Sequence, residues 1–184
     1  MEKVECIKKE SILHTQKSKV IVGTVLLSGL GVALPRIFHV LAGSSAGATF
    51  LPMHIAVLLA SLIFGGLSGS IVAGISVLCS FLLTGMPSVA RLPYMAIELV
   101  IYAALLGLLN KKYNSYISLI LTIVLGRVLY AGVLFVSSEV FMLNLYGTQV
   151  LESVKLGLPG LVIQILLVPV VAKFIKERIR KWIN

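Results

Sequence analysis

Aspartate is absent from the 184-residue chain, and cysteine is scarce. The first absence excludes every mechanism that needs an aspartate as nucleophile, base or metal ligand. The two cysteines, Cys6 and Cys79, form no CxxC pair and are too few for a disulfide framework or a cysteine zinc site. No glycine is followed by lysine, which excludes a phosphate-binding loop of the GxxxxGK[ST] type. Any ATP-driven work that involves this chain therefore needs an ATPase on another chain.

Charge is also scarce, because only 12% of the residues are charged whereas 58% are hydrophobic. A soluble domain has roughly a quarter charged residues, and a small domain buries only about two thirds of its surface. The net charge of +9 is concentrated at the two ends and in one loop, and Arg36 is the only charged residue between Val20 and Ala90. This pattern excludes a typical soluble enzyme or a nucleic-acid-binding domain and indicates that lipid is the solvent.

The apolar residues fall into continuous runs that predict helices across a membrane. A spanning helix needs roughly 20 mostly apolar residues, and the runs are continuous rather than alternating, which argues against a β-barrel. A very tight turn is expected at Gly65 and Gly66. The predicted fold is an all-α membrane protein, a bundle of six transmembrane helices at 20–42, 51–64, 67–83, 92–109, 117–136 and 156–174.

The lysines and arginines predict the orientation of the bundle. Twelve of them lie in the two tails and in the loop at Lys111 and Lys112, which an even number of spans places on one side. Because positive loops face the cytoplasm, both termini are expected inside, and the loops 43–50, 84–91 and 137–155 outside. The chain then divides into a basic tail (1–19), a six-helix domain (20–175) and a second basic tail (176–184).

Four ionisable residues within or beside the spans require an explanation, because charge inside a membrane is costly and usually functional. Arg36 and Arg91 are expected near the outer ends of their helices, and Glu98 lies about two turns into its helix, where Arg127 of the next helix could pair with it. A buried ion pair that only joins two helices is one interpretation. A polar pocket open to the outside is the other, and it would be lined by Arg36, His39, Phe50, His54, Arg91, Tyr94, Glu98, Arg127, Tyr130, Asn144 and Gln164.

Two other kinds of site are weaker predictions. Gly66 to Gly69 matches the GxSG of rhomboid-type intramembrane proteases, but His39 and His54 are expected at the opposite face from Ser68, so we expect a tight helix turn instead. These two histidines lack a third metal ligand. We expect neither an enzymatic activity nor a resident cofactor or metal ion.

Small residues in the first span predict a close helix contact. Thr24 with Ser28 and Gly29 with Ala33 are small-xxx-small pairs, which let two helices approach closely. The contact could lie inside the bundle or with another membrane subunit.

Several local strings, taken together, resemble the substrate-binding S component of an energy-coupling factor (ECF) vitamin transporter. They are GVALPR at 31–36, FLPMHIAVLL at 50–59, LTGMP at 83–87, PYMAIELVIY at 93–102 and the pair Gly126 and Arg127. The resemblance covers almost the whole chain after the first tail.

The resemblance implies a division of labour in a prokaryotic cell membrane. The S component captures a small water-soluble micronutrient, such as pantothenate, folate or a queuosine precursor, while a transmembrane coupling subunit and two ATPase subunits drive its release inside. Docking through the first span is implied, with Val25 and Gly29 where two alanines would be expected, beside Thr24, Ser28 and Ala33. A stand-alone secondary transporter and an intramembrane enzyme are the alternatives.

Overall fold

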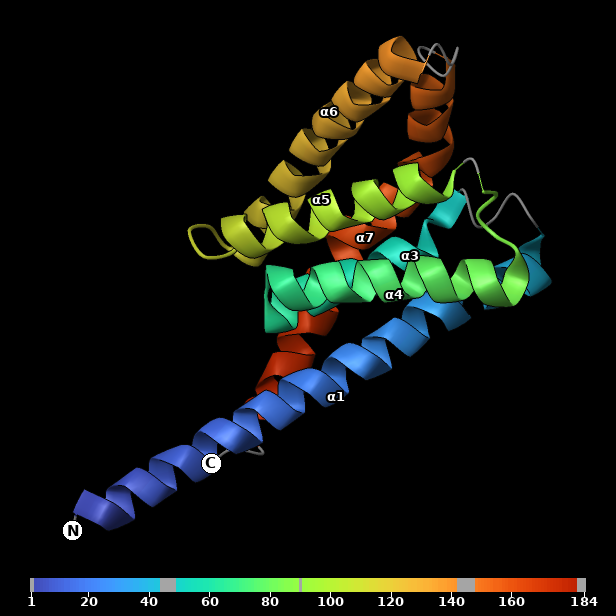
Figure 1. Ribbon diagram of the computed structural model, residues 1–184. Coiled ribbons are helices and arrows are strands. Elements are labelled where there is room, and N and C mark those ends of the chain that lie inside the picture. Colours follow the sequence, from blue (N-terminus) through green and yellow to red (C-terminus); the bar gives the residue numbers. More distant parts are fainter. Residues whose placement is uncertain (1, 44–48, 90, 142–147, 182–184) are drawn as a thin grey trace.

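The computed structural model describes residues 2–43, 49–89, 91–141 and 148–181, and within them the chain is all helical, as predicted. Five of the helices are long and apolar enough to cross a membrane, while α3 has 13 residues. The helices are α1 (Glu2–Ala42), α3 (Pro52–Phe64), α4 (Gly66–Thr84), α5 (Leu92–Leu109), α6 (Ser115–Phe141) and α7 (Thr148–Lys181) (Figure 1).

The observed helix bounds match the predicted spans in the middle of the chain and exceed them at its ends. α5 has the bounds predicted for the fourth span, whereas α6 and α7 are longer than predicted at both ends. α1 begins at Glu2, so the residues expected to form a separate tail continue the first helix (Figure 1). Two prolines lie inside α7, Pro159 and Pro169, and the helix changes direction along its length.

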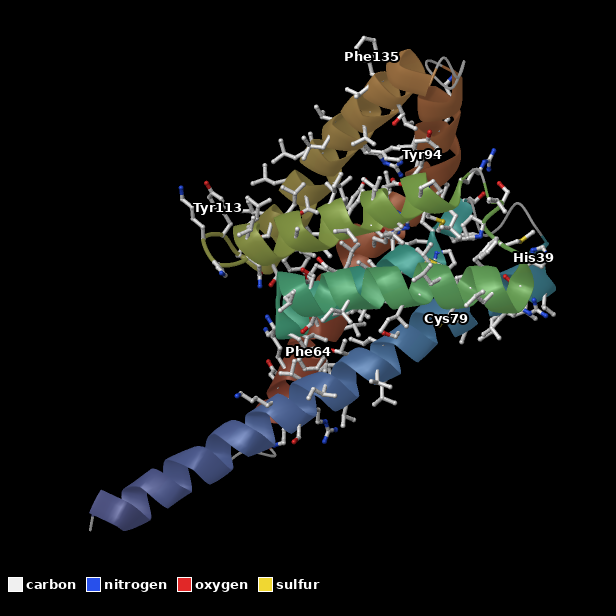
Figure 2. All side chains as sticks on the ribbon, in the orientation of Figure 1. His39, Phe64, Cys79, Tyr94, Tyr113 and Phe135 are labelled. Atoms are coloured by element: carbon white, nitrogen blue, oxygen red, sulfur yellow. The ribbon has the colours of Figure 1, made fainter. Side chains whose placement is uncertain are left out.

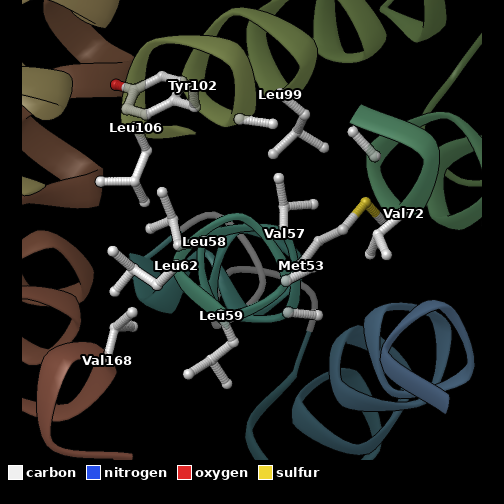
Figure 3. Packing of buried hydrophobic residues seen from close by; sticks show 14 of the residues in the cluster. Met53, Val57, Leu58, Leu59, Leu62, Val72, Leu99, Tyr102, Leu106 and Val168 are labelled. Atoms are coloured by element: carbon white, nitrogen blue, oxygen red, sulfur yellow. The ribbon is translucent and has the colours of Figure 1, made fainter. Parts of the chain in front are cut away.

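The short helix α3 is the centre of the bundle. Its sequence is apolar on every side, which is typical of a buried helix, and Ala56, Val57, Leu58 and Ala60 are fully buried. Figure 3 shows side chains of α4, α5 and α7 around it, and α1 also packs along it. Because α3 is enclosed by other helices, its 13 residues need not match the thickness of a membrane.

The GxSG segment forms a close helix junction. Gly65 alone separates α3 from α4, and its φ of 96° is a conformation that glycine adopts without strain. A Cβ at Gly69 would lie 2.8 Å from the Cβ of Ser61 and 3.0 Å from that of Ala103, and the Ser61 hydroxyl donates a hydrogen bond of 2.7 Å to the Ala103 carbonyl. A Cβ at Gly107 would overlap the backbone of Gly66. These glycines therefore let α3, α4 and α5 approach within backbone contact.

Candidate functional site

An ion pair between α5 and α6 lies inside the bundle. Arg127 Nη1 donates a hydrogen bond of 3.0 Å to Glu98 Oε1, and the two side chains are only 13% and 10% exposed. The pairing predicted from the sequence is therefore confirmed. Nε2 of His54 lies 3.8 Å from the same carboxylate oxygen, which is beyond hydrogen-bond distance.

Local structure explains how these side chains meet. His54 stands in the first turn of α3, which Pro52 begins with its φ already fixed for a helix. Glu98 and Tyr102 are four residues apart and therefore share one face of α5. The ring of Tyr102, which is fully buried, meets the ring of His54 edge to face at 5.5 Å between centroids. The first turn of α3 therefore packs against the face of α5 that carries Glu98 and Tyr102.

α7 closes the cluster from another side. Gln164 is fully buried, and its Nε2 donates a hydrogen bond of 3.4 Å to the carbonyl of Leu51. Leu51 has a φ of 48°, an unusual conformation for a branched residue, which turns the chain into α3. The glycines of α7 allow this approach, because a Cβ at Gly160 would lie 2.6 Å from the Thr49 carbonyl oxygen and one at Gly157 would lie 3.5 Å from Arg127 Nη2.

We call His54, Glu98, Tyr102, Arg127 and Gln164 the polar cluster. Much of its hydrogen-bonding capacity is unused. The following buried atoms of the cluster lack a hydrogen-bond partner within the described part of the chain: Nδ1 and Nε2 of His54, the Tyr102 hydroxyl, Nε and Nη2 of Arg127, and Oε1 of Gln164. Buried polar groups are nearly always satisfied, and leaving one unmet costs about 1–3 kcal/mol. The cluster is therefore a set of donors and acceptors that a polar molecule could satisfy.

The arrangement restricts the chemistry of such a molecule. Glu98 and Arg127 carry opposite formal charges, so the pair adds no net charge of its own. Arg127 still offers the N–H groups of Nε and Nη2, which suit a carboxylate or carbonyl oxygen. Gln164 offers a carbonyl oxygen, which needs an N–H or O–H donor. The unmet atoms therefore complement the chemistry of a group that carries both an oxygen acceptor and an N–H or O–H donor.

Three further residues predicted for the site lie around the cluster. Tyr130 lies on α6 three residues after Arg127 and is half-buried. Figure 2 shows Tyr94 near the beginning of α5, on the side of α6 and α7. Arg91 precedes α5 and is exposed to solvent. These residues extend the cluster toward the end of the bundle at which α5 begins.

The other residues predicted for the site are not part of the polar cluster. Arg36 is exposed on α1, His39 is half-buried near the end of α1 (Figure 2), and Phe50 packs against Phe38 with ring centroids 5.4 Å apart. Asn144 lies outside the described residues. In the part of the chain that the structure describes, no group of three or more histidine, cysteine or acidic side chains is placed to hold a metal ion.

The site has one contributor that no sequence pattern indicates. Leu51 contributes its backbone carbonyl, and no side-chain pattern reveals such a role. Tyr102 lies four residues after Glu98, and this spacing is a signal for a shared helix face.

The small residues of α1 divide between two faces of the helix, which corrects part of the docking prediction. Thr24 and Ser28 are buried inside the bundle, 7% and 4% exposed, so they cannot meet another subunit. The Thr24 hydroxyl donates to the Val20 carbonyl at 2.7 Å, the Ser28 hydroxyl to the Thr24 carbonyl at 2.9 Å, and Ser76 of α4 donates to the Ser28 carbonyl at 3.3 Å. This face binds α4.

The remaining predicted docking residues form an outward stripe. Val25, Gly29 and Ala33 are spaced by four residues and are all exposed. A Cβ at Gly29 would have no described atom within 4 Å. This stripe is the part of the predicted docking surface that remains accessible.

No family model matches this chain, and neither a curated protein nor a solved structure with significant similarity was found. Function is therefore inferred from the polar cluster, from the exposed stripe and from the distribution of charge.

Proposed function

We propose that this protein is the substrate-binding S component of an ECF-type importer, which captures a small water-soluble micronutrient from outside a prokaryotic cell. The observation that carries the proposal is the polar cluster: an ion pair with unmet hydrogen-bonding atoms, inside a bundle of predominantly apolar helices. Ionisable groups at membrane depth are costly and are retained mainly for function. A purely structural ion pair would not need further unsatisfied donors and acceptors on α3, α5 and α7.

The substrate is a small molecule with an acidic or carbonyl oxygen for Arg127 and an N–H or O–H donor for Gln164. Pantothenate, folate and queuosine precursors each carry both groups. Tyr94 and Tyr130 add aromatic surface beside the cluster, which suits an amphipathic ligand because polar sites in proteins usually have mostly apolar walls.

The ends of the chain support the proposed orientation. Figure 1 shows the beginning of α1 and the end of α7 directed toward the same end of the bundle, and the turn between α5 and α6, with Lys111 and Lys112, lies toward that end as well. By the positive-inside rule this end is cytoplasmic. His54 in the first turn of α3 and Glu98 about two turns into α5 then lie nearer the outside than the inside.

Energy for transport would come from companion subunits. The chain carries no phosphate-binding loop, and the stripe of Val25, Gly29 and Ala33 offers a surface where the backbone of α1 can approach a coupling subunit closely. The proposed complex contains this chain, a transmembrane coupling subunit and two ATPase subunits.

The test is to purify the full chain alone, denature it and identify the released small molecules by mass spectrometry. The proposal expects one micronutrient in a stoichiometric amount, and it expects vesicles containing the isolated chain to take up none of it without ATP and partner subunits. Uptake driven by an ion gradient alone would make the protein a secondary transporter. Peptide cleavage that is lost in Ser68→Ala would make it a protease. Either result would overturn the proposal.

A further inference from the structure

A cavity separate from the polar cluster lies at the other end of the bundle. Its volume is about 600 Å³, and it is an open groove bordered by the middle of α1, the end of α3 and the last turns of α7. Figure 2 shows Phe64, at the end of α3, between α1 and α7. A Cβ at Gly23 would overlap the Phe64 ring, so glycine at this position lets the ring form one wall of the cavity.

The interior of this cavity is apolar and is reached from the side of the bundle. Val22 and Leu26 of α1 line it and are 57% and 68% exposed, and Ile175 of α7 also contributes to its wall. In a membrane such an exposed apolar side is in contact with acyl chains. A concave apolar surface of this kind holds a chain more firmly than a convex helix face, because more atoms contact it.

Two cations stand at one end of the cavity, and they come from opposite ends of the sequence. Lys19 of α1 and Arg178 of α7 both line it. Arg178 is positioned over the ring of Phe174, one turn earlier on α7, with 5.3 Å from the guanidinium carbon to the ring centroid. Leu26 follows Lys19 by two turns of helix, which places it about 10 Å deeper along α1. The cavity thus has a cationic mouth and an apolar interior.

We propose that this cavity binds an anionic phospholipid, whose phosphate lies between Lys19 and Arg178 and whose acyl chain lies along Val22, Leu26 and Phe64. Along the cavity the two cations come first and the apolar residues follow, just as in a phospholipid the charged headgroup comes first and the apolar acyl chain follows. Basic residues close to a membrane surface attract anionic lipids with about 1 kcal/mol each. This site is separate from the polar cluster and does not depend on the proposed transport function.

The experiment measures lipid retention by native mass spectrometry of the full chain, extracted from vesicles with equal amounts of phosphatidylglycerol and phosphatidylcholine. The wild-type chain is expected to retain phosphatidylglycerol preferentially. Lys19→Gln with Arg178→Gln should weaken that binding roughly 30-fold, as two lost contacts of this strength imply. Leu26→Trp, which fills the cavity and leaves the charge unchanged, should also displace the lipid.

A matched control removes the same charge near the same end of the bundle. Lys173 and Lys176 line a different cavity, of about 390 Å³, between α6 and α7. Lys173→Gln with Lys176→Gln should change phosphatidylglycerol retention less than about twofold, because neither residue lines the proposed site. An equal loss in this control would show nonspecific attraction, and would overturn the proposal.

Other outcomes would also overturn the proposal, and the wild-type measurement alone can do so. Equal retention of both lipids would exclude an anionic-lipid site even if a variant failed to fold. Displacement by inorganic phosphate, with no effect of Leu26→Trp, would indicate a simple anion site. If the wild-type chain forms dimers, and Leu26→Trp abolishes them without changing the amount of bound lipid, a second copy of the chain occupies the cavity.

Discussion

Neutralising the Glu98–Arg127 pair separates its contribution to folding from the role in binding that the proposed function gives it. At the observed 3.0 Å the attraction between the two charges is about 5 kcal/mol with an effective dielectric constant of about 20. Removing both ions from water costs several kcal/mol each, so the pair contributes little net stability. Removing one partner leaves a buried charge alone, which costs about 3–5 kcal/mol.

We therefore expect Glu98→Gln and Arg127→Gln to destabilise the protein by about 3–5 kcal/mol each. The double variant should lie within about 1 kcal/mol of wild type, because it buries no charge and two amides can hydrogen-bond to each other. Unfolding in detergent, followed by circular dichroism during an SDS titration, measures all four proteins.

Binding should not follow the same pattern. The amount of co-purified small molecule per mole of protein should fall more than tenfold in both single variants, and it should stay low in the double variant although its stability returns. A double variant that is stable and also retains the molecule at the wild-type level would refute the reasoning, because the pair would then serve only to join α5 to α6.

Three further predictions concern single positions. Tyr102→Phe removes a buried hydroxyl that has no described partner, so the ligand-free protein should be as stable as wild type or more stable by up to about 1–3 kcal/mol. Retention of the co-purified molecule should fall, and a melting temperature lowered together with retention would count against a role in binding. Gly107→Ala should destabilise by about 1–3 kcal/mol or more, because the new Cβ overlaps the backbone of Gly66, and a thermal melt in detergent measures this. A Cβ at Gly29 would meet no described atom within 4 Å, so Gly29→Leu should leave the melting temperature of the isolated chain unchanged. Co-purification of this variant with a coupling subunit should be lost. Unchanged assembly would exclude this stripe as the docking surface.

The sequence predicted best what depends on hydropathy and helix rise. α5 has the predicted bounds because an apolar block follows Pro93 in the first turn and ends at the polar Asn110. The pairing of Glu98 with Arg127 followed from the depth of each residue along its helix. Both inferences use one-dimensional information, and neither needs to know how the helices are rotated.

The orientation of each helix about its own axis could not be predicted. In a soluble protein the apolar face points inward, but a membrane helix is apolar on both its lipid face and its packed face. Thr24 and Ser28 therefore looked equivalent to Val25 and Gly29, although the first two face α4 and the last two face outward. The central place of α3 was hidden for the same reason, since a buried short helix and a short span have similar composition.

The polar cluster is built from two groups of helices. His54, Glu98 and Tyr102 belong to α3 and α5, whereas Arg127 and Gln164 belong to α6 and α7. A molecule that satisfies unmet atoms on both parts would hold them together, and each satisfied group recovers about 1–3 kcal/mol of desolvation cost. Under the proposed function, occupancy of the cluster should therefore fix the position of α6 and α7 against the α3–α5 core.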